Sequence, residues 1–291
     1  MFNSMVLMSG ADFFDDGFAI NAYMDDAVPI DVAAAKREHD SIRQALIAAG
    51  VSVKTVKPPV DCQDGVYTAN WALVRGNKAV MSRLPGPRQA EEPYARQVLT
   101  DLGKEIIEIP DGLRFSGQGD ALPCGDLLFA GSGYRTDRQV HDFLADTLGY
   151  TVISLQAIPK RRWHGFGPRV TNAASGWPDS FYYDIDLALA VLRPPSNTQK
   201  GLIAWCPEAF TRQSRQMLRN CDAVDKIEVS RAEATKGFAC NLVSSGETVI
   251  MSAHAPVFKA ELERRGFTVV TPEIVELAKG GGFIRCTTLT L

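Results

Sequence analysis

Residues 70–81 read Asn-Trp-Ala-Leu-Val-Arg-Gly-Asn-Lys-Ala-Val-Met, a polar residue followed by two short apolar runs on either side of a turn. Short apolar runs separated by a glycine-containing turn predict a pair of β-strands. A helical pattern follows near residues 90–102, and Gly103 then leads into a third expected strand at 106–109. The stretch therefore predicts one strand–strand–helix–strand unit that begins at Asn70.

The same order of features recurs along the chain, which predicts a repeat architecture. Further units begin at Asp120, at 184–186 and at Asn241, with helices expected near 137–148, 211–220 and 256–265. The N-terminal part supplies a partial copy, with a strand at 6–8, a helix near 32–49 and a strand at 51–53. Each unit needs its neighbours to bury its apolar face, and no low-complexity linker separates them. We therefore expect one closed α/β domain of five units over residues 1–291.

Polar residues lead the units, and units that surround an axis bring their leading side chains together. These residues are Asn70, Asp120, Asp184, Asp186 and Asn241. Carboxylates and amides that converge are costly to bury unless a cationic partner satisfies them. A planar guanidinium with five N–H donors suits such a pocket. For any one position the alternative is that Asp or Asn starts a turn, but repetition of the whole set favours a site.

A single cysteine follows a run of glycines near the end of the sequence. Residues 280–291 read Gly-Gly-Gly-Phe-Ile-Arg-Cys-Thr-Thr-Leu-Thr-Leu, and the part from Cys286 onward is typical of a β-strand. Glycines permit tight turns and close approach to a ligand. A docked terminal strand would hold Cys286 beside a pocket as a nucleophile, and the alternative is a buried, inert cysteine.

Composition narrows the class of protein. The chain has 291 residues, 45% of them hydrophobic and 22% charged, and a net charge of −3, which gives no broad electrostatic case for nucleic acid or an anionic membrane. No apolar run approaches transmembrane length, and the first residues lack the pattern of a signal peptide. Six scattered cysteines without zinc-ligand spacing predict reduced thiols in the cytoplasm, with no metal and no cofactor. A homo-oligomer is compatible with the sequence, which does not determine the oligomeric state.

Five short segments, in the same order, resemble the pentein superfamily of guanidine-modifying enzymes, which includes arginine deiminases, dimethylarginine dimethylaminohydrolases, arginine dihydrolases and amidinotransferases. The segments are 6–24, 64–70 (Asp-Gly-Val-Tyr-Thr-Ala-Asn), 115–122 (Phe-Ser-Gly-Gln-Gly-Asp-Ala-Leu), 131–137 (Gly-Ser-Gly-Tyr-Arg-Thr-Asp) and 280–288. The resemblance implies a five-bladed α/β propeller of ββαβ units with pseudo-fivefold symmetry. That fold agrees with the five repeats counted above.

The resemblance also implies a mechanism. The Cys286 thiolate would attack the central carbon of a guanidinium, an amine or ammonia would leave, and water would resolve an S-linked thiouronium intermediate. A cation bound beside the thiol lowers its pKa, and carboxylates hold the guanidinium in place. The substrate-binding residues implied in this way are Asn21, Asn70, Asp120, Arg135 and Asp186.

The chain departs from the family pattern at two positions. Enzymes of the family use a histidine in a His-x-Asp pair as general acid and base, and here Asp184 stands in place of that histidine, two residues before Asp186. A carboxylate can relay protons only if its pKa is raised substantially toward neutrality. Ser116 stands where the family usually has a substrate-binding glutamate, and Gln118 is a neutral substitute nearby.

Histidines elsewhere in the chain are candidates for the missing group. His164 lies in residues 160–180, a stretch rich in Gly, Pro, Trp and Arg that predicts a long binding loop or lid. It is either a compensating catalytic group or an exposed loop residue. His39 and His141 fall on expected helices and are expected at the surface.

Taken together, the sequence predicts a cysteine-dependent hydrolase of a guanidino or amidino compound. Cys286 is the expected nucleophile, and Asp184 and His164 are the expected acid/base candidates. Two alternatives remain open. One is an amidinotransferase, and the other is a binding protein that kept the pocket and lost the chemistry.

Overall fold

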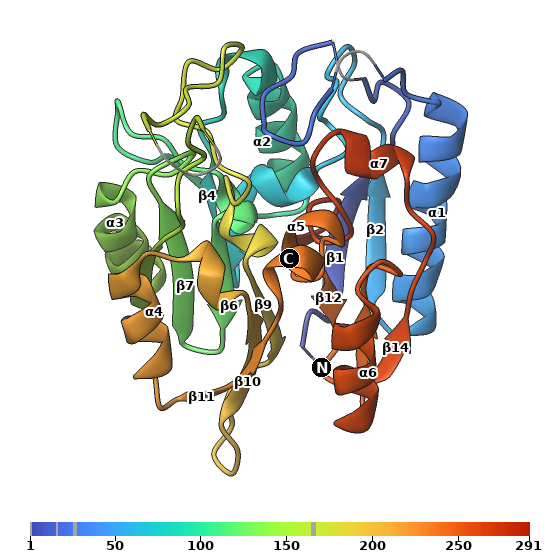
Figure 1. The fold of residues 1–291 in the computed structure, drawn as a ribbon. Helices are drawn as coiled ribbons and strands as arrows, with labels where there is room; N and C mark the ends of the chain where they lie inside the picture. Colours follow the sequence, from blue (N-terminus) through green and yellow to red (C-terminus); the bar gives the residue numbers. More distant parts are fainter. Residues whose placement is uncertain (1, 16, 26–27, 164–166) are drawn as a thin grey trace.

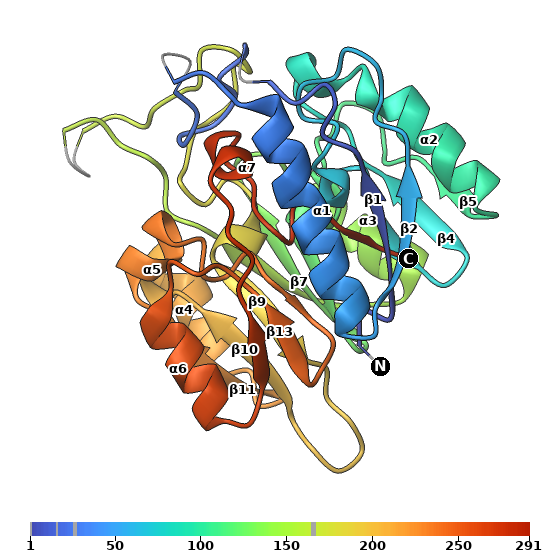
Figure 2. The ribbon, with the colours of Figure 1, turned by 90° about the vertical axis from the view of Figure 1, so that its right-hand side faces the viewer.

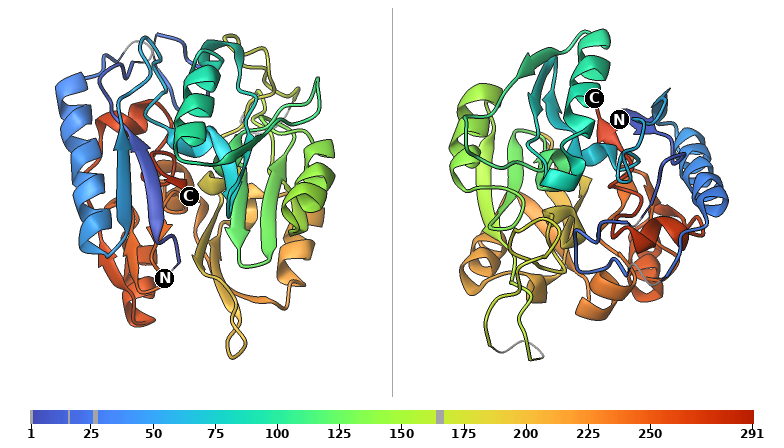
Figure 3. Two further views of the ribbon diagram at one scale, coloured as in Figure 1. Left: turned by 180° about the vertical axis from the view of Figure 1, so that it is seen from behind. Right: turned by 90° about the horizontal axis from the view of Figure 1, so that it is seen from above.

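The computed structural model describes residues 2–15, 17–25, 28–163 and 167–291, in which the strands form five separate three-stranded sheets. Seen from above, the sheets surround a central axis and the long helices lie on the outside (Figure 3). The expected five-bladed α/β propeller is thereby confirmed, with each sheet forming one blade. None of the helices in the described ranges is long and apolar enough to cross a membrane.

Every blade has the same strand pattern, in which two antiparallel strands are followed by a parallel third. The blades, in chain order, are β15 (Leu289–Thr290), β1 (Met5–Ser9) and β2 (Ser52–Val56); β3 (Ala72–Arg75), β4 (Lys78–Met81) and β5 (Glu105–Ile107); β6 (Ala121–Cys124), β7 (Leu127–Ser132) and β8 (Thr151–Gln156); β9 (Leu189–Arg193), β10 (Gly201–Trp205) and β11 (Val224–Glu228); and β12 (Val243–Ser244), β13 (Thr248–Ile250) and β14 (Thr268–Val270).

A helix connects the second strand of each blade to the third, because a parallel neighbour cannot be reached by a tight turn. These helices are α1 (Val32–Ala48), α2 (Glu91–Asp101), α3 (Gln139–Leu148), α4 (Arg212–Arg219) and α6 (Pro256–Arg264) (Figure 1). Each lies within two residues of its expected range. Each packs one apolar face on its sheet, as α3 does with Val140, Leu144 and Leu148. Two short helices, α5 (Arg231–Lys236) and α7 (Glu276–Lys279), lie outside this pattern.

The two ends of the chain close the propeller together. Strand β15 pairs antiparallel with β1, with Leu289 opposite Leu7, so the first blade contains both the first strand and the last (Figure 2). The Gln118 side chain fixes this strand from the third blade, since its Nε2 donates to Thr290 O and its Oε1 accepts from Thr290 N, both at 2.8 Å. Closure therefore joins the two termini and a residue of the third blade.

The terminal strand is shorter than the sequence predicts, and Cys286 lies before it. The hydroxyl of Thr287 donates to Ile284 O and that of Thr288 to Arg285 O, both at 2.9 Å. Such local side-chain bonds compete with strand pairing. The chain therefore turns at 284–287 and enters the strand at Leu289.

Short 3-10 helices precede the first strand of three blades. They are η1 (Thr68–Asn70), η3 (Gly117–Gly119) and η4 (Ile185–Leu187), and two others, η2 (Gly86–Arg88) and η5 (Pro207–Ala209), lie elsewhere. Asn70, Asp120 and Asp186 lie in or directly after these turns, and Asn241 and Cys286 precede β12 and β15. The five polar residues thus occupy equivalent places, one at the start of each blade.

In residues 160–163 and 167–180 the expected long loop carries isolated bridges and no regular strand. Arg161 pairs with Arg169 and Thr171 with Pro178, and the segment extends away from the propeller body (Figure 2). Asn172 Nδ2 donates to Ala19 O at 2.9 Å, so the loop is tied to the N-terminal segment beside the axis. His164 lies outside the described residues.

If β15 closes the fold, Leu289→Ala should cost about 2–5 kcal/mol of unfolding free energy, the usual cost of truncating a fully buried leucine. Urea titration measures it. Val257→Ala, at a side chain that is 74% exposed, is the control and should change stability little. A loss below about 0.5 kcal/mol at Leu289, within the range of surface substitutions, would contradict this role for the strand.

Candidate functional site

Cys286 lies buried at the axis and contacts two of the other leading residues. Its Sγ accepts from Asn241 Nδ2 at 3.1 Å and donates to Asp186 Oδ2 at 3.3 Å. Its backbone N–H donates to Asn241 Oδ1 at 3.2 Å. The asparagine therefore fixes both the backbone and the sulfur, and the thiol proton points at a carboxylate.

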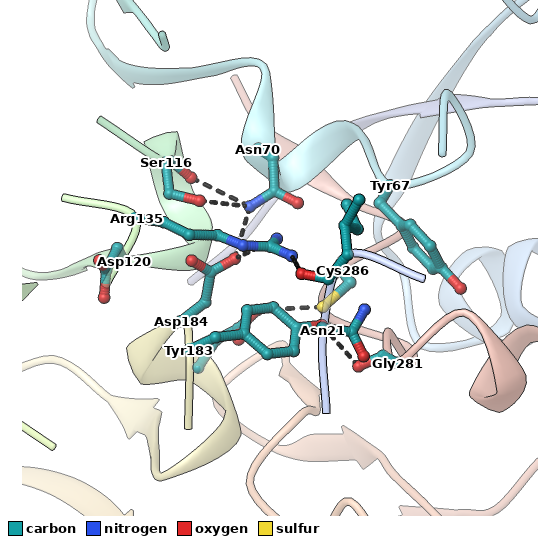
Figure 4. A network of polar contacts seen from close by, with 12 residues as sticks. Asn21, Tyr67, Asn70, Ser116, Asp120, Arg135, Tyr183, Asp184, Gly281 and Cys286 are labelled. Atoms are coloured by element: carbon teal, nitrogen blue, oxygen red, sulfur yellow. Dashed lines mark hydrogen bonds and ion pairs between the residues drawn. The ribbon is translucent and has the colours of Figure 1, made fainter. Parts of the chain in front are cut away.

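Asp184 joins the second blade to the fourth across the axis (Figure 4). Asn70 Nδ2 donates to Asp184 Oδ2 at 2.7 Å and to Ser116 Oγ at 3.0 Å. The other oxygen of this fully buried carboxylate, Oδ1, has no partner among the described residues, and the same is true of Asp186 Oδ1. Unpartnered, buried carboxylate oxygens are costly, and they indicate a site for a ligand that donates N–H groups.

Asp120 supports these carboxylates from behind. Its Oδ1 accepts from the backbone N–H of Ile185 at 3.0 Å, which fixes the turn that carries Asp184 and Asp186. A Cβ added at Gly131 would collide with the Asp120 carboxylate, so only glycine fits there. Asp120 does not line the pocket, and its visible contacts are those of a positioning residue.

A narrow pocket with ≈ 200 Å³ of empty space adjoins the thiol. Arg135 stacks over the Tyr183 ring at 4.0 Å and places Nη1 3.7 Å from Asp184 Oδ2 (Figure 4). The 3.7 Å separation from Asp184 is too long for a tight hydrogen bond, so the guanidinium offsets the charge of Asp184 without filling its acceptor sites. The lining residues are Ile20, Asn21, Asp64, Tyr67, Asn70, Arg88, Arg135, Tyr183, Gly280 and Cys286.

The glycine run forms one wall of this pocket. A Cβ at Gly280 would collide with Tyr67 Oη, and a Cβ at Gly281, whose φ is +82°, would collide with the Asn21 amide. Asn21 Nδ2 donates to Gly280 O at 2.9 Å, and Tyr183 Oη donates to Gly281 O at 2.7 Å. The run is glycine because the backbone approaches these side chains closely.

Arg88 and Asp64 line the pocket but were not predicted as site residues. Arg88 Nη1 donates to Asn70 Oδ1 at 2.7 Å, and its Nε and Nη2 form a two-pronged ion pair with Glu91. The i, i+3 spacing of Arg88 and Glu91 after a Pro-Gly-Pro turn was a usable signal. Asp64 begins the segment 64–70 that resembles the family, but the resemblance did not indicate a role for it.

Three other residues are placed differently from the prediction. The amide of Gln118 is occupied by Thr290 and by Arg285 Nη2, which donates to its Oε1 at 2.8 Å, and Gln118 lies outside the pocket lining. His39 and His141, expected at the surface, are buried. His141 bridges Ser154 Oγ and Gly131 O, both at 2.8 Å, because the polar ring faces the sheet under α3.

Burial controls the electrostatics of the site. It raises the pKa of the Cys286 thiol well above its usual value, and the neighbouring Asp186 adds to this. Burial also raises the pKa of Asp186, with a further contribution from Asp184 and an opposing one from Arg285. The pKa of Asp120 rises to about 8 and that of Asp64 to about 6, again mainly through burial. The empty site therefore holds protons that a bound cation would displace.

Comparison with known proteins agrees with this geometry, although no family model matches the chain. The chain is 32% identical over 285 residues to N(G),N(G)-dimethylarginine dimethylaminohydrolase of Mycobacterium tuberculosis. The match covers 98% of this chain and 84% of that protein. The chain belongs to the pentein superfamily of guanidine-modifying enzymes. Its relatives are hydrolases that act on guanidino groups.

A second relative extends well beyond this chain. The bifunctional arginine dihydrolase/ornithine cyclodeaminase ArgZ of Synechocystis is 29% identical over 292 residues, and the match spans 98% of the chain but 37% of that protein. The crystal structure of the N-terminal domain of ArgZ bound to product superposes with a TM-score of 0.82 at 28% identity, covering 98% of this chain and 96% of that domain. The pentein match therefore concerns the dihydrolase-bearing part of ArgZ.

The described residues hold no group of three or more His, Cys, Asp or Glu side chains arranged to bind a metal ion. Among the described residues, Asp184 and Asp186 each keep one unpartnered oxygen at the axis, and both side chains contact residues that line the pocket, Asn70 and Cys286 respectively. This set of groups suits an organic cation.

Burial raises the pKa of the Cys286 thiol most, and the ionised form of Asp186 adds to it. Asp186→Asn should therefore make alkylation of Cys286 by iodoacetamide about 3- to 10-fold faster at a pH high enough to ionise the Asp186 carboxyl of the parent protein, because the thiolate is the reactive form. Intact mass measures the rate, and Cys286→Ser corrects for the other thiols. Equal or slower alkylation would show that Asp186 does not act on the thiol.

Stability should depend on pH through Asp120. Its carboxyl keeps its proton up to about pH 8 in the folded protein, whereas the unfolded chain loses it near the usual 3.8. The folded state then binds more protons, so the free energy of unfolding falls as pH rises through this window. Asp120→Asn should reduce the slope, which urea titrations at several pH values measure. If Asp120→Asn keeps the same dependence of unfolding free energy on pH as the parent protein, the raised pKa of Asp120 is contradicted.

Proposed function

We propose that the protein is a cysteine-dependent hydrolase of an arginine-like guanidino compound and acts through a covalent thiouronium intermediate. The observation that carries the proposal is the Cys286 thiol, 3.3 Å from Asp186, in a pocket backed by carboxylate oxygens that have no donor. A guanidinium has the planar donors that these oxygens need.

The substrate guanidinium would enter against Asp186 and Asp184, while its distal end meets the pocket arginines. Arg135 is held loosely, at 3.7 Å from Asp184, so an incoming cation can replace it there and free it for a substrate carboxylate. Asn70 stays in place because Arg88 and Asp184 hold opposite ends of its amide. These contacts orient the central carbon toward Sγ.

In the first chemical step, Cys286 Sγ forms a bond to the central carbon and the thiol proton moves to Asp186 Oδ2. The bond from that carbon to one nitrogen then breaks, and the leaving nitrogen takes up a proton from the buried carboxyl pair Asp184 and Asp186. The thiol proton thus departs with ammonia or an amine, and a positively charged thiouronium remains on the sulfur.

In the second step, water attacks the same carbon and the carbon–sulfur bond breaks. The product carries a urea group, Cys286 regains its proton, and one proton is released. The carboxyl pair can serve both steps because burial and mutual repulsion raise the pKa of Asp186, which gives a proton-carrying carboxyl near neutral pH.

The solved relatives support this assignment. One structure of the ArgZ N-terminal domain, at 28% identity and a TM-score of 0.82, is described as covalently bound to a reaction intermediate. All six cysteines of this chain are free, which fits a reducing compartment, and we assign the protein to the cytoplasm.

The test is intact-mass analysis after incubation with arginine and a panel of other guanidino compounds. We expect an adduct on the parent protein, formation of a urea product, and neither with Cys286→Ser. Asp186→Asn should lower turnover by about 100-fold or more, the usual scale for loss of a proton-transfer group.

Other outcomes would point to the alternative functions. A stable product carrying the amidine on an added amine would identify an amidinotransferase. Equal binding by the parent protein and Cys286→Ser, without adduct or turnover for any compound, would contradict the hydrolase and identify a binding protein.

A further inference from the structure

Asp184 and Asp186 each keep one carboxylate oxygen without a donor at the axis. The other oxygen of each is engaged, by Asn70 Nδ2 in Asp184 and by the Cys286 thiol in Asp186. Both side chains are fully buried, so water does not reach the free oxygens. Each oxygen therefore gains most from a ligand that brings an N–H group.

Asp184 lies directly behind the pocket lining. Its two closest polar neighbours, Asn70 and Arg135, both line the pocket, at 2.7 and 3.7 Å from Oδ2. The ion pair with Arg135 is long and leaves Oδ1 unfilled. A ligand nitrogen that enters between these two residues meets the carboxylate of Asp184.

The Asp184 carboxylate also has little freedom to retreat. A Cβ at Gly119 would collide with Asp184 Oδ2 and with Asn70 Nδ2. The backbone at Gly119, in the third blade, therefore packs closely against both side chains. The Ile185 N–H is held by Asp120 at 3.0 Å, which fixes the backbone immediately after Asp184. A ligand group that suits Asp184 poorly cannot be accommodated by a small shift of the carboxylate.

We propose that Asp184 is a specificity-determining residue that selects guanidino compounds whose terminal nitrogens all carry hydrogens, and rejects those with a dimethylated terminal nitrogen. This inference rests on the proposed function and names its substrate class. An NH₂ group directed at Asp184 donates to Oδ2, the oxygen beside Asn70 and Arg135, where the Arg135 contact is long. A dimethylamino group there has no donor and buries two methyl groups against a carboxylate.

The size of the pocket does not choose between the two kinds of substrate. Its ≈ 200 Å³ of empty space includes open solvent, so the preference rests on the chemistry of Asp184. The relatives are named for both kinds of substrate, dimethylarginine and arginine. Asp184 favours the unmethylated kind for this chain.

The experiment measures binding to Cys286→Ser by calorimetry, with arginine and with its N,N-dimethylated counterpart. We expect the dimethylated compound to bind about 10- to 100-fold more weakly, the factor produced by leaving a buried acceptor without a partner. Adding Asp184→Ala removes the acceptor and opens space, so the two affinities should then agree to within about threefold.

Asp137→Asn in the same Cys286→Ser background is the control. It removes a carboxylate that pairs with Arg114 outside the pocket. This variant should keep the preference for arginine. If the preference for arginine also disappears in Asp137→Asn, the preference depends on net charge, and the role of Asp184 is overturned.

The outcomes separate this inference from the proposed function. Binding of the dimethylated compound that is as tight as that of arginine overturns the inference alone, as does a preference that survives Asp184→Ala. Failure of Cys286→Ser to bind any guanidino compound, with no adduct on the parent protein, removes the proposed function and the inference with it.

Discussion

Burial of excess negative charge at the propeller axis is the constraint on which the site depends. Among the described residues, five carboxylates and three guanidinium groups lie buried around the pocket: Asp64, Glu91, Asp120, Asp184 and Asp186 against Arg88, Arg135 and Arg285. The interior cannot hold two unbalanced charges cheaply, so the empty site is neutralised by protons or by a cation. The raised pKa values of Asp120 and Asp186 reflect the protons, and the unpartnered oxygens mark where a cation would bind.

The repeat explains how this charge is assembled from distant parts of the sequence. Each blade begins with a turn that directs one polar side chain to the axis, and the five positions are occupied by Asn70, Asp120, Asp186, Asn241 and Cys286. The nucleophile is thus the fifth member of a structural series. Because the last strand completes the first blade, the step that closes the fold also brings the thiol against Asp186 and Asn241.

Much of this arrangement could be predicted from sequence because it repeats. The alternation of apolar runs, helical periodicity and turns recurs five times. An error in the expected bounds of one strand or helix therefore does not change the predicted fold. The leading polar residues were predicted to converge, and Asn70 with Asp184 and Cys286 with Asp186 indeed make contact. The expected strand at Cys286 was wrong because two threonine hydroxyls stabilise a turn, a local effect that strand propensity does not capture.

Contacts that depend on the direction in which a side chain points could not be predicted from the repeat pattern. Gln118 was assigned to the pocket as a neutral substitute near Ser116, where the family usually has a glutamate, but it faces the C-terminal strand. His141 looked exposed because helix positions alone do not show that its ring bonds to Gly131 and Ser154. Arg88 entered the site through its bond to Asn70, from a turn without repeat symmetry. Such pairings depend on the three-dimensional packing of different blades.

The most direct test of the charge balance is the number of protons exchanged when Cys286→Ser binds a guanidinium compound at pH 7. Calorimetry in buffers of different ionisation enthalpy gives this number. A cation that replaces protons on the buried carboxyls should release a net fraction of a proton, approaching one per molecule bound. Tight binding without proton release, or with proton uptake, would contradict the account.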